Sequence, residues 1–172
     1  MIEKTTIRRM LELFFAYPTR TFHLRELSRE LGLSMPTVLS TVRRLKKDGL
    51  VIVKRSRPLA QISANTDLLL FARLKRIYNL ESLYLSGLVD FLYKEYRRPR
   101  AIICFGSYSR GDDTEKSDVD IAIITDLPKE LDLSKFEKRL GRNISIHIIN
   151  LKRISTEFKA NLCNGIALEG AL

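Results

Sequence analysis

The part of the sequence that most constrains the fold is residues 103–124, ICFGSYSRGDDTEKSDVDIAII. Two apolar runs, each of the length of a buried strand, flank a Gly-Ser pair and a polar segment. Asp118 and Asp120 are two residues apart where the second run begins, so we expect their side chains on one face of that strand. Carboxylates that share a face repel each other unless a cation lies between them, and Mg²⁺ (or Mn²⁺) prefers such hard oxygen ligands. The stretch therefore predicts a strand, a turn and a strand with a metal site.

The turn between the two strands carries groups that suit phosphate. Gly106 lets the backbone approach a triphosphate closely, and the hydroxyl of Ser107 and nearby amides can donate to its oxygens. Arg110 adds a cation that either faces phosphate or holds the loop. The sequence thus predicts nucleotide binding by these three residues beside the metal ligands Asp118 and Asp120. The alternative is that the two aspartates are only solvated turn and edge residues.

The spacing Phe105-Gly106-Ser107, ten residues, Asp118-Val119-Asp120-Ile121 resembles the signature of the DNA polymerase β-like nucleotidyltransferase superfamily, above all its minimal nucleotidyltransferase branch. The resemblance covers about residues 85–172 and implies an α/β domain with a small mixed sheet. It implies transfer of a nucleoside monophosphate from an NTP, with ATP expected, to a hydroxyl with release of pyrophosphate. Asp118 and Asp120 would then be the catalytic, metal-binding carboxylates.

The resemblance also implies a third carboxylate from a later strand, and here the sequence departs from the pattern. The strand expected in NISIHIINL has Ser145 where an aspartate belongs, and His147 is the next residue on that face. Serine cannot replace a charged ligand, and a magnesium site favours oxygen over the nitrogen of His147. We therefore expect nucleotide binding to be better supported than transfer. A weak or inactive transferase domain that senses a nucleotide or binds a partner remains the alternative.

Residues 23–51, HLRELSRELGLSMPTVLSTVRRLKKDGLV, predict two helices joined by a tight turn. Gly32 ends the first helix, and Ser34 caps the second, with Pro36 in its first turn. A strand, a basic tip and a returning strand are expected to follow. This order resembles the winged helix-turn-helix of bacterial and archaeal transcription regulators. The resemblance implies binding of double-stranded DNA, although such units also serve as plain protein-interaction domains.

One face of the second helix, together with the basic tip, carries the expected DNA contacts. Small hydroxyl side chains near the start of a helix can reach base edges while basic ones further along contact phosphates. Residues 1–64 hold 13 basic and 5 acidic residues, which favours a polyanionic partner, although a basic surface without a partner is an alternative. The expected contacts are Thr37, Ser40, Thr41, Arg43, Arg44 and Lys47 on the helix and Lys54, Arg55 and Arg57 at the tip.

Residues 65–96 lack proline and are rich in apolar residues, which predicts one long helix or two, broken near Asn79. Such apolar helices need partners on more than one side. They form either a dimerisation spine or the first helix on the sheet of the following domain, and both can hold together. The resemblance to the minimal branch adds a helical protein partner as a further expectation.

The overall prediction is an α+β chain with a winged helix-turn-helix in residues 1–64, a helical connector in 65–84 and a nucleotidyltransferase-like domain in 85–172. All-apolar runs reach only five residues, as in residues 68–72, and are too short to cross a bilayer. We therefore expect a cytoplasmic, homodimeric protein with no membrane segment.

Overall fold

The computed structural model describes residues 5–54, 60–150 and 154–171. They fall into two compact units, Met1–Leu74 and Lys75–Leu172, and the division lies inside the helix α4 (Leu69–Ser86). The boundaries predicted after residues 64 and 84 remain predictions. Arg55 and Arg57 lie outside the described residues.

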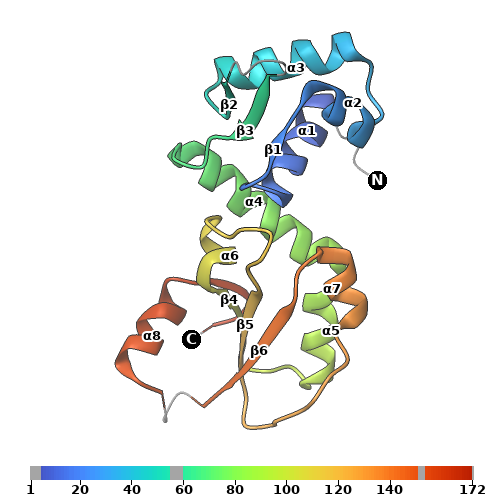
Figure 1. The fold of residues 1–172 in the computed structure, drawn as a ribbon. Helices are drawn as coiled ribbons and strands as arrows, with labels where there is room; N and C mark the ends of the chain where they lie inside the picture. Colours follow the sequence, from blue (N-terminus) through green and yellow to red (C-terminus); the bar gives the residue numbers. More distant parts are fainter. Residues whose placement is uncertain (1–4, 55–59, 151–153, 172) are drawn as a thin grey trace. The chain divides into compact units, whose positions relative to one another are not determined.

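The first unit is built of three helices and a small antiparallel sheet, with the strand order β1-β3-β2 (Figure 1). Its elements are α1 (Thr6–Ala16), β1 (Thr21–Phe22), α2 (Leu24–Leu31), α3 (Met35–Lys47), β2 (Val51–Lys54) and β3 (Gln61–Ala64). This order confirms the predicted helix-turn-helix followed by a β-hairpin.

The turn between α2 and α3 has the local structure that its sequence predicts. Gly32 ends α2 in the left-handed conformation, with φ of +62°. The side chain of Ser34 accepts a hydrogen bond from the Thr37 amide and caps α3, whose first turn contains the proline. In the core of the same unit, Phe14 of α1 and Phe22 of β1 are fully buried and meet edge to face, with ring centroids 5.4 Å apart.

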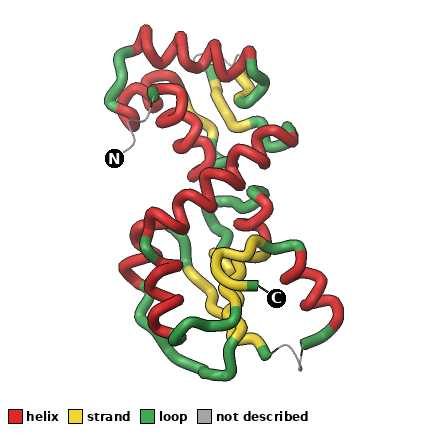
Figure 2. The backbone as a smooth tube through the Cα atoms, turned by 180° about the vertical axis from the view of Figure 1, so that it is seen from behind, coloured by secondary structure: helices red, strands yellow, loops and turns green. Residues whose placement is uncertain are grey.

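The second unit contains a four-stranded mixed sheet with the order β6-β5-β4-β7. Figure 2 shows strands of this unit in yellow with helices in red around them. β5 is parallel to β6, whereas β4 is antiparallel to both β5 and β7. Besides its part of α4, the unit contains α5 (Leu88–Glu95), β4 (Ala101–Phe105), α6 (Gly106–Arg110), β5 (Val119–Ile124), α7 (Ser134–Leu140), β6 (Ile144–Ile149), α8 (Thr156–Cys163) and β7 (Ile166–Gly170). The small mixed sheet that was predicted is confirmed.

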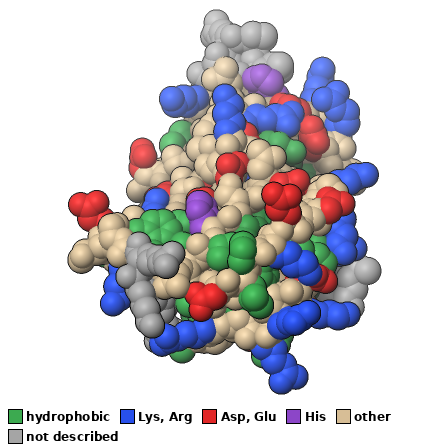
Figure 3. Space-filling model, turned by 90° about the horizontal axis from the view of Figure 1, so that it is seen from below, with side chains coloured by type: hydrophobic (Ala, Val, Ile, Leu, Met, Phe, Trp, Pro, Cys, Tyr) green, Lys and Arg blue, Asp and Glu red, His purple; other side chains and the backbone are tan. Residues whose placement is uncertain are grey.

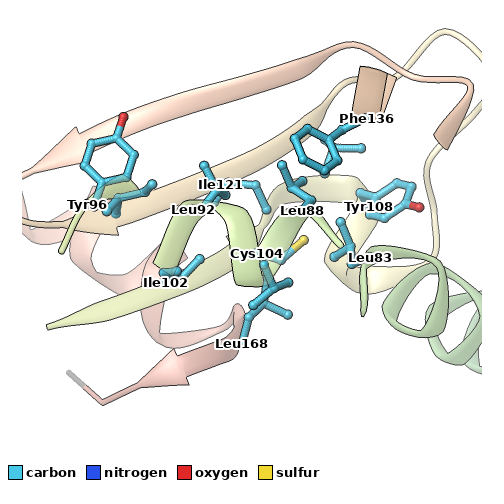
Figure 4. Packing of buried hydrophobic residues seen from close by; sticks show 13 residues of the cluster. Leu83, Leu88, Leu92, Tyr96, Ile102, Cys104, Tyr108, Ile121, Phe136 and Leu168 are labelled. Carbon is cyan, nitrogen blue, oxygen red and sulfur yellow. The ribbon is translucent and has the colours of Figure 1, made fainter. Parts of the chain in front are cut away.

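Helices cover both faces of this sheet. Alternate residues of each strand point to opposite sides, and apolar residues lie on both sides. One face packs Ile102 of β4 and Ile121 of β5 against Leu92 of α5 and Phe136 of α7 (Figure 4). The other face, with Ile103 of β4, packs against α8. Burial on both faces explains why β4 is apolar throughout.

The structure corrects the position of the helix break. The connector breaks at Gly87, which has a φ of +77°, and not near Asn79. The helix that follows, α5, packs on the sheet, as one of the two alternatives predicted. Asn79 is buried inside α4, where its amide donates hydrogen bonds to Asp113 Oδ1 at 2.7 Å and to the Tyr108 carbonyl at 2.9 Å. Asn79, a polar residue in an apolar helix, therefore connects α4 to Tyr108 and Asp113.

That contact belongs to a charged network beneath the loop between α6 and β5. The carboxylate of Asp113 is fully buried, and Lys75 Nζ, also buried, lies 2.6 Å from its Oδ1. Arg142 lies 3.8 Å from its other oxygen. Burial lowers the pKa of Lys75 below its ordinary value, although the carboxylate of Asp113 acts in the opposite direction. The loop is thus tied to α4 by a buried ion pair.

We expect Lys75→Met to destabilise the fold by about 3–5 kcal/mol, because it leaves the buried carboxylate of Asp113 without its closest cation. Adding Asp113→Asn should recover part of that loss, since the remaining amide carries no charge. Urea denaturation of the wild type, both single variants and the double variant gives the coupling energy. Losses that simply add would show that the two side chains do not stabilise each other.

Candidate active site

The site residues predicted in the second unit come together where β4 ends. Phe105 pairs with Asp120 in the antiparallel register, so the turn that starts at Gly106 lies beside the Asp120 carboxylate. Gly106 has a φ of +72°, and a Cβ placed there would lie 2.6 Å from Asp120 Oδ2. Glycine is favoured at this position, because a side chain would be strained at this φ and would displace the Asp120 carboxylate.

The two aspartates and Ser107 are open to a ligand. Asp118 is exposed and Asp120 half-buried. Within the described part of the chain, neither the carboxylate of Asp118 nor the hydroxyl of Ser107 makes a hydrogen bond or an ion pair. The Asp120 carboxylate has one hydrogen-bonding partner in those residues, His147, whose Nε2 lies 3.4 Å from Oδ1. An interaction over that distance is a weak hydrogen bond, so both carboxylates keep acceptor capacity.

The strand β6 places Ser145 and His147 where the sequence analysis expected them. Ser145 is directly opposite Asp120 in the parallel register, and His147 follows two residues later on the same face. The imidazole packs edge to face against Phe105, with ring centroids 5.2 Å apart, and near Phe158 of α8. That aromatic packing holds the ring beside Asp120. Sequence reasoning missed it, because α8 was not predicted.

The donor set fits a hard divalent cation in part. Asp118 and Asp120 supply carboxylate oxygens, which Mg²⁺ prefers. The described residues include no group of three or more His, Cys, Asp or Glu side chains that could hold a metal. A magnesium ion between these two aspartates would therefore complete its shell with water and ligand oxygens, as it commonly does beside phosphates.

Arg110, for which phosphate binding and loop holding are both predicted as alternatives, pairs with a residue of its own loop. Its Nε donates to Asp112 Oδ2 at 3.0 Å, and both side chains are more than half exposed. An ion pair so exposed contributes at most about 1 kcal/mol. It therefore presents only a small barrier to a phosphate that competes for the guanidinium.

A pocket of about 270 Å³ adjoins Asp118 and contains residues that the sequence analysis missed. Lys116, Arg142 and Asn143 are part of its lining. Arg142 and Asn143 come from the turn between α7 and β6, far from the Asp-Val-Asp motif in sequence. No local pattern connects that turn to the motif, because the parallel pairing of β5 with β6 brings them together.

In the first unit, α3 presents most of its predicted DNA contacts to solvent. Ser40, Arg43, Arg44 and Lys47 are exposed, Thr37 is half-buried, and Lys54 is exposed at the end of β2. The placement of Thr41 on this face was wrong. Thr41 is only 6% exposed, and its hydroxyl donates to the Thr37 carbonyl at 2.8 Å. It lies one helical turn from Val38 and Leu45 on the buried face.

No helix in the described residues is long and apolar enough to cross a membrane.

Comparison with known proteins agrees with both predicted domains. Residues 85–166 match the model of the nucleotidyltransferase domain family, and residues 23–52 match that of a winged helix-turn-helix DNA-binding family. A curated relative from Methanocaldococcus jannaschii, named "Putative protein adenylyltransferase MJ0604", is 55% identical over 40 residues. That match covers 23% of this chain and 40% of the relative. No solved structure matches the chain. The chain therefore joins a winged helix-turn-helix of the DNA-binding kind to a domain of the nucleotidyltransferase family.

Proposed function

We propose that the second unit binds an NTP, with ATP expected, together with Mg²⁺ or Mn²⁺, in a protein that also binds double-stranded DNA. The observation that carries the proposal is the close approach of Asp120 to Gly106, 2.6 Å from where a Cβ would stand. This geometry puts a carboxylate beside the start of α6, where the Ser107 hydroxyl makes no hydrogen bond within the described part of the chain. Such an arrangement suits a triphosphate bridged to carboxylates by a cation.

Each residue has a distinct part in this proposal. Asp118 and Asp120 hold the cation, and Ser107 and the backbone at Gly106 hold phosphate oxygens. Lys116, in the lining of the adjoining pocket, supplies a positive charge near the same place. The bound cation would supply charge neutralisation at the phosphate being transferred.

If transfer occurs, a hydroxyl oxygen forms a bond to the α-phosphorus and gives its proton to water, the bond from that phosphorus to the bridging oxygen breaks, and pyrophosphate leaves. The printed name of the Methanocaldococcus relative favours a hydroxyl on a protein as the acceptor. Ser145 opposite Asp120 argues that this step is slow, because the third carboxylate of the resemblance is a neutral hydroxyl here.

Replacing both aspartates, Asp118→Asn with Asp120→Asn, should weaken ATP binding in Mg²⁺ by about tenfold or more, because the cation loses both its protein ligands. Isothermal titration calorimetry with and without Mg²⁺ measures the effect, which should vanish without the metal. Asp90→Asn with Glu130→Gln, two exposed acids elsewhere in the unit, is the matched control. Unchanged affinity in the first variant would remove the proposed site.

Ser145→Asp should raise the rate of pyrophosphate release, because it restores a carboxylate directly opposite Asp120. Ser145→Asn is the control of nearly equal size without the charge. A coupled pyrophosphate assay with ATP compares both variants with the wild type. Robust release by the wild type, or equal rates in all three proteins, would mean that Ser145 is not the missing ligand.

A regulator with a nucleotide-sensing domain is the second candidate, and His147 favours it. The imidazole lies 3.4 Å from Asp120 and is held by Phe105, in the region where the resemblance calls for a third ligand. A domain that binds a nucleotide without turning it over would change DNA affinity when ATP is added. The pyrophosphate assay separates this candidate from an enzyme.

We propose that the exposed face of α3 contacts the phosphate backbone of duplex DNA. Arg43 and Lys47 are exposed and four residues apart, so they lie on one face of the helix. Arg44, which pairs with Asp48 at 3.2 Å, lies beside them and remains largely exposed.

Arg43→Ala with Lys47→Ala should lower duplex affinity and reduce the slope of log K against log salt by about 0.9 for each phosphate that is no longer neutralised. Fluorescence anisotropy at several salt concentrations gives the slope. Lys94→Ala with Lys138→Ala, in the second unit, removes the same charge and should leave the slope unchanged. A flat salt dependence in the wild type would instead favour a protein-interaction role for the winged helix.

We also propose that the protein is a homodimer that pairs through α4. Ile77 is 64% exposed and Leu85 73% exposed, and residues eight apart lie on one helical face. Tyr84, 45% exposed, borders the same face and stands seven residues after Ile77. Large apolar side chains at heptad-like spacing suit a second copy of the same helix.

Ile77→Lys with Leu85→Lys should therefore convert a dimer into a monomer, because charges would be buried in the interface. Sedimentation velocity measures the mass, and Arg73→Lys, at an exposed position of the same helix, is the control. A wild-type protein that sediments as a monomer at all concentrations would contradict the proposal.

A further inference from the structure

A second pocket in the nucleotidyltransferase unit lies at the opposite end of β4 from Gly106. It has a volume of about 430 Å³ and is lined in part by the loop from Arg97 to Arg100 and by the ends of β5 and β6. Arg100 precedes β4, whereas Gly106 follows it, so the length of a five-residue strand separates this pocket from the candidate active site. The pocket is thus a place that the proposed nucleotide site does not use.

Three arginines are part of the lining of this pocket. Arg97, Arg98 and Arg100 are all exposed. In the described part of the chain, none of the three side chains makes a hydrogen bond or an ion pair. The carboxylate in the lining, Asp126, accepts a hydrogen bond at 2.8 Å from Asn150, which is also part of the lining. The lining therefore has three basic side chains and one acidic side chain, an excess of positive charge.

The backbone that presents these arginines is strained. The helix α5 ends in a Schellman motif: the amide of Arg97 donates to the Lys94 carbonyl at 3.1 Å, and that of Arg98 to the Tyr93 carbonyl at 2.9 Å. Arg97 has a φ of +53° and Arg98 a φ of +62°. Glycine is the usual residue in such a motif, and an L-residue in this conformation costs about 1–2 kcal/mol.

Two consecutive arginines thus occupy positions where the fold alone would favour glycine. Within the described residues, neither arginine side chain forms an ion pair that would offset this cost. The face seen in Figure 3 carries both basic and acidic side chains. Strained backbone commonly occurs at ligand sites.

We propose that this pocket binds an anion that carries two or more phosphate groups. Guanidinium groups form forked, charge-assisted hydrogen bonds to phosphate oxygens, and three of them match a ligand with several phosphates. A free oligophosphate and the backbone of a nucleic acid both offer this chemistry. The pocket needs no metal, because its own charge is positive.

The test is isothermal titration of the full chain with tripolyphosphate in EDTA, where a site that depends on a divalent cation does not contribute. Arg97→Gly with Arg98→Gly should weaken binding by about tenfold or more. The same variant should melt at or above the wild-type temperature, since the strain is relieved. Arg100→Gln, which leaves the left-handed residues untouched, should also weaken binding and serves if the first variant does not fold.

Lys94→Gln with Lys138→Gln is the control, since it removes two exposed charges outside the pocket. Absence of binding to the wild type, equal affinity in the arginine variants, or an equal loss in the control would each overturn the proposal. Asp118→Asn with Asp120→Asn should bind tripolyphosphate in EDTA as the wild type does, so this result is independent of the nucleotide site.

A parallel titration with a short single-stranded oligonucleotide assigns the source of the phosphate groups. A weaker affinity of the arginine variants for tripolyphosphate alone indicates a free oligophosphate. A weakening that extends to the oligonucleotide indicates a nucleic-acid backbone.

Discussion

The carboxylate of Asp113 is the charge on which the rest of the second unit depends. It is removed from water, and a buried charge without compensation would cost several kcal/mol. Its compensation comes from Lys75 and Asn79 on α4 and from Arg142 before β6. These interactions link three segments that lie far apart in the sequence. The loop that leads to Asp118 is therefore anchored to α4, while Asp118 itself stays exposed.

That fixed loop explains how a small sheet builds a site with few residues. The pairing of Phe105 with Asp120 sets the carboxylate beside the turn, and the absence of a Cβ at Gly106 lets it approach. The parallel pairing of β5 with β6 then brings Ser145 to the same row. Asp120 thus has β4 on one side, in antiparallel pairing, and β6 on the other, in parallel pairing. A substitution at Ser145 of β6 therefore changes the side chain next to the Asp120 carboxylate.

Local patterns allowed the strands β4 and β5 and the cap at Ser34 to be predicted, because each depends on neighbours in sequence. The turn predicted at Gly106 is instead the start of the short helix α6 (Gly106–Arg110). The buried network could not be predicted, since Lys75 and Asp113 are 38 residues apart and no sequence pattern distinguishes a buried lysine in a helix from an exposed one. The error at Thr41 was avoidable: it is three residues after Val38 and four before Leu45, which is core spacing. The polar hydroxyl of Thr41 suggested an exposed position, but the hydroxyl can be buried because it donates a hydrogen bond to the Thr37 carbonyl of the same helix.

The sheet order has a consequence for how the chain folds during synthesis. β7 follows the other strands in sequence yet pairs with β4, the first of them. Until β7 emerges from the ribosome, one edge of β4 has unpaired amides and carbonyls, which is a template for wrong pairing. The first unit can complete its own sheet long before then. The nascent nucleotidyltransferase unit therefore passes through a period in which it is vulnerable to aggregation.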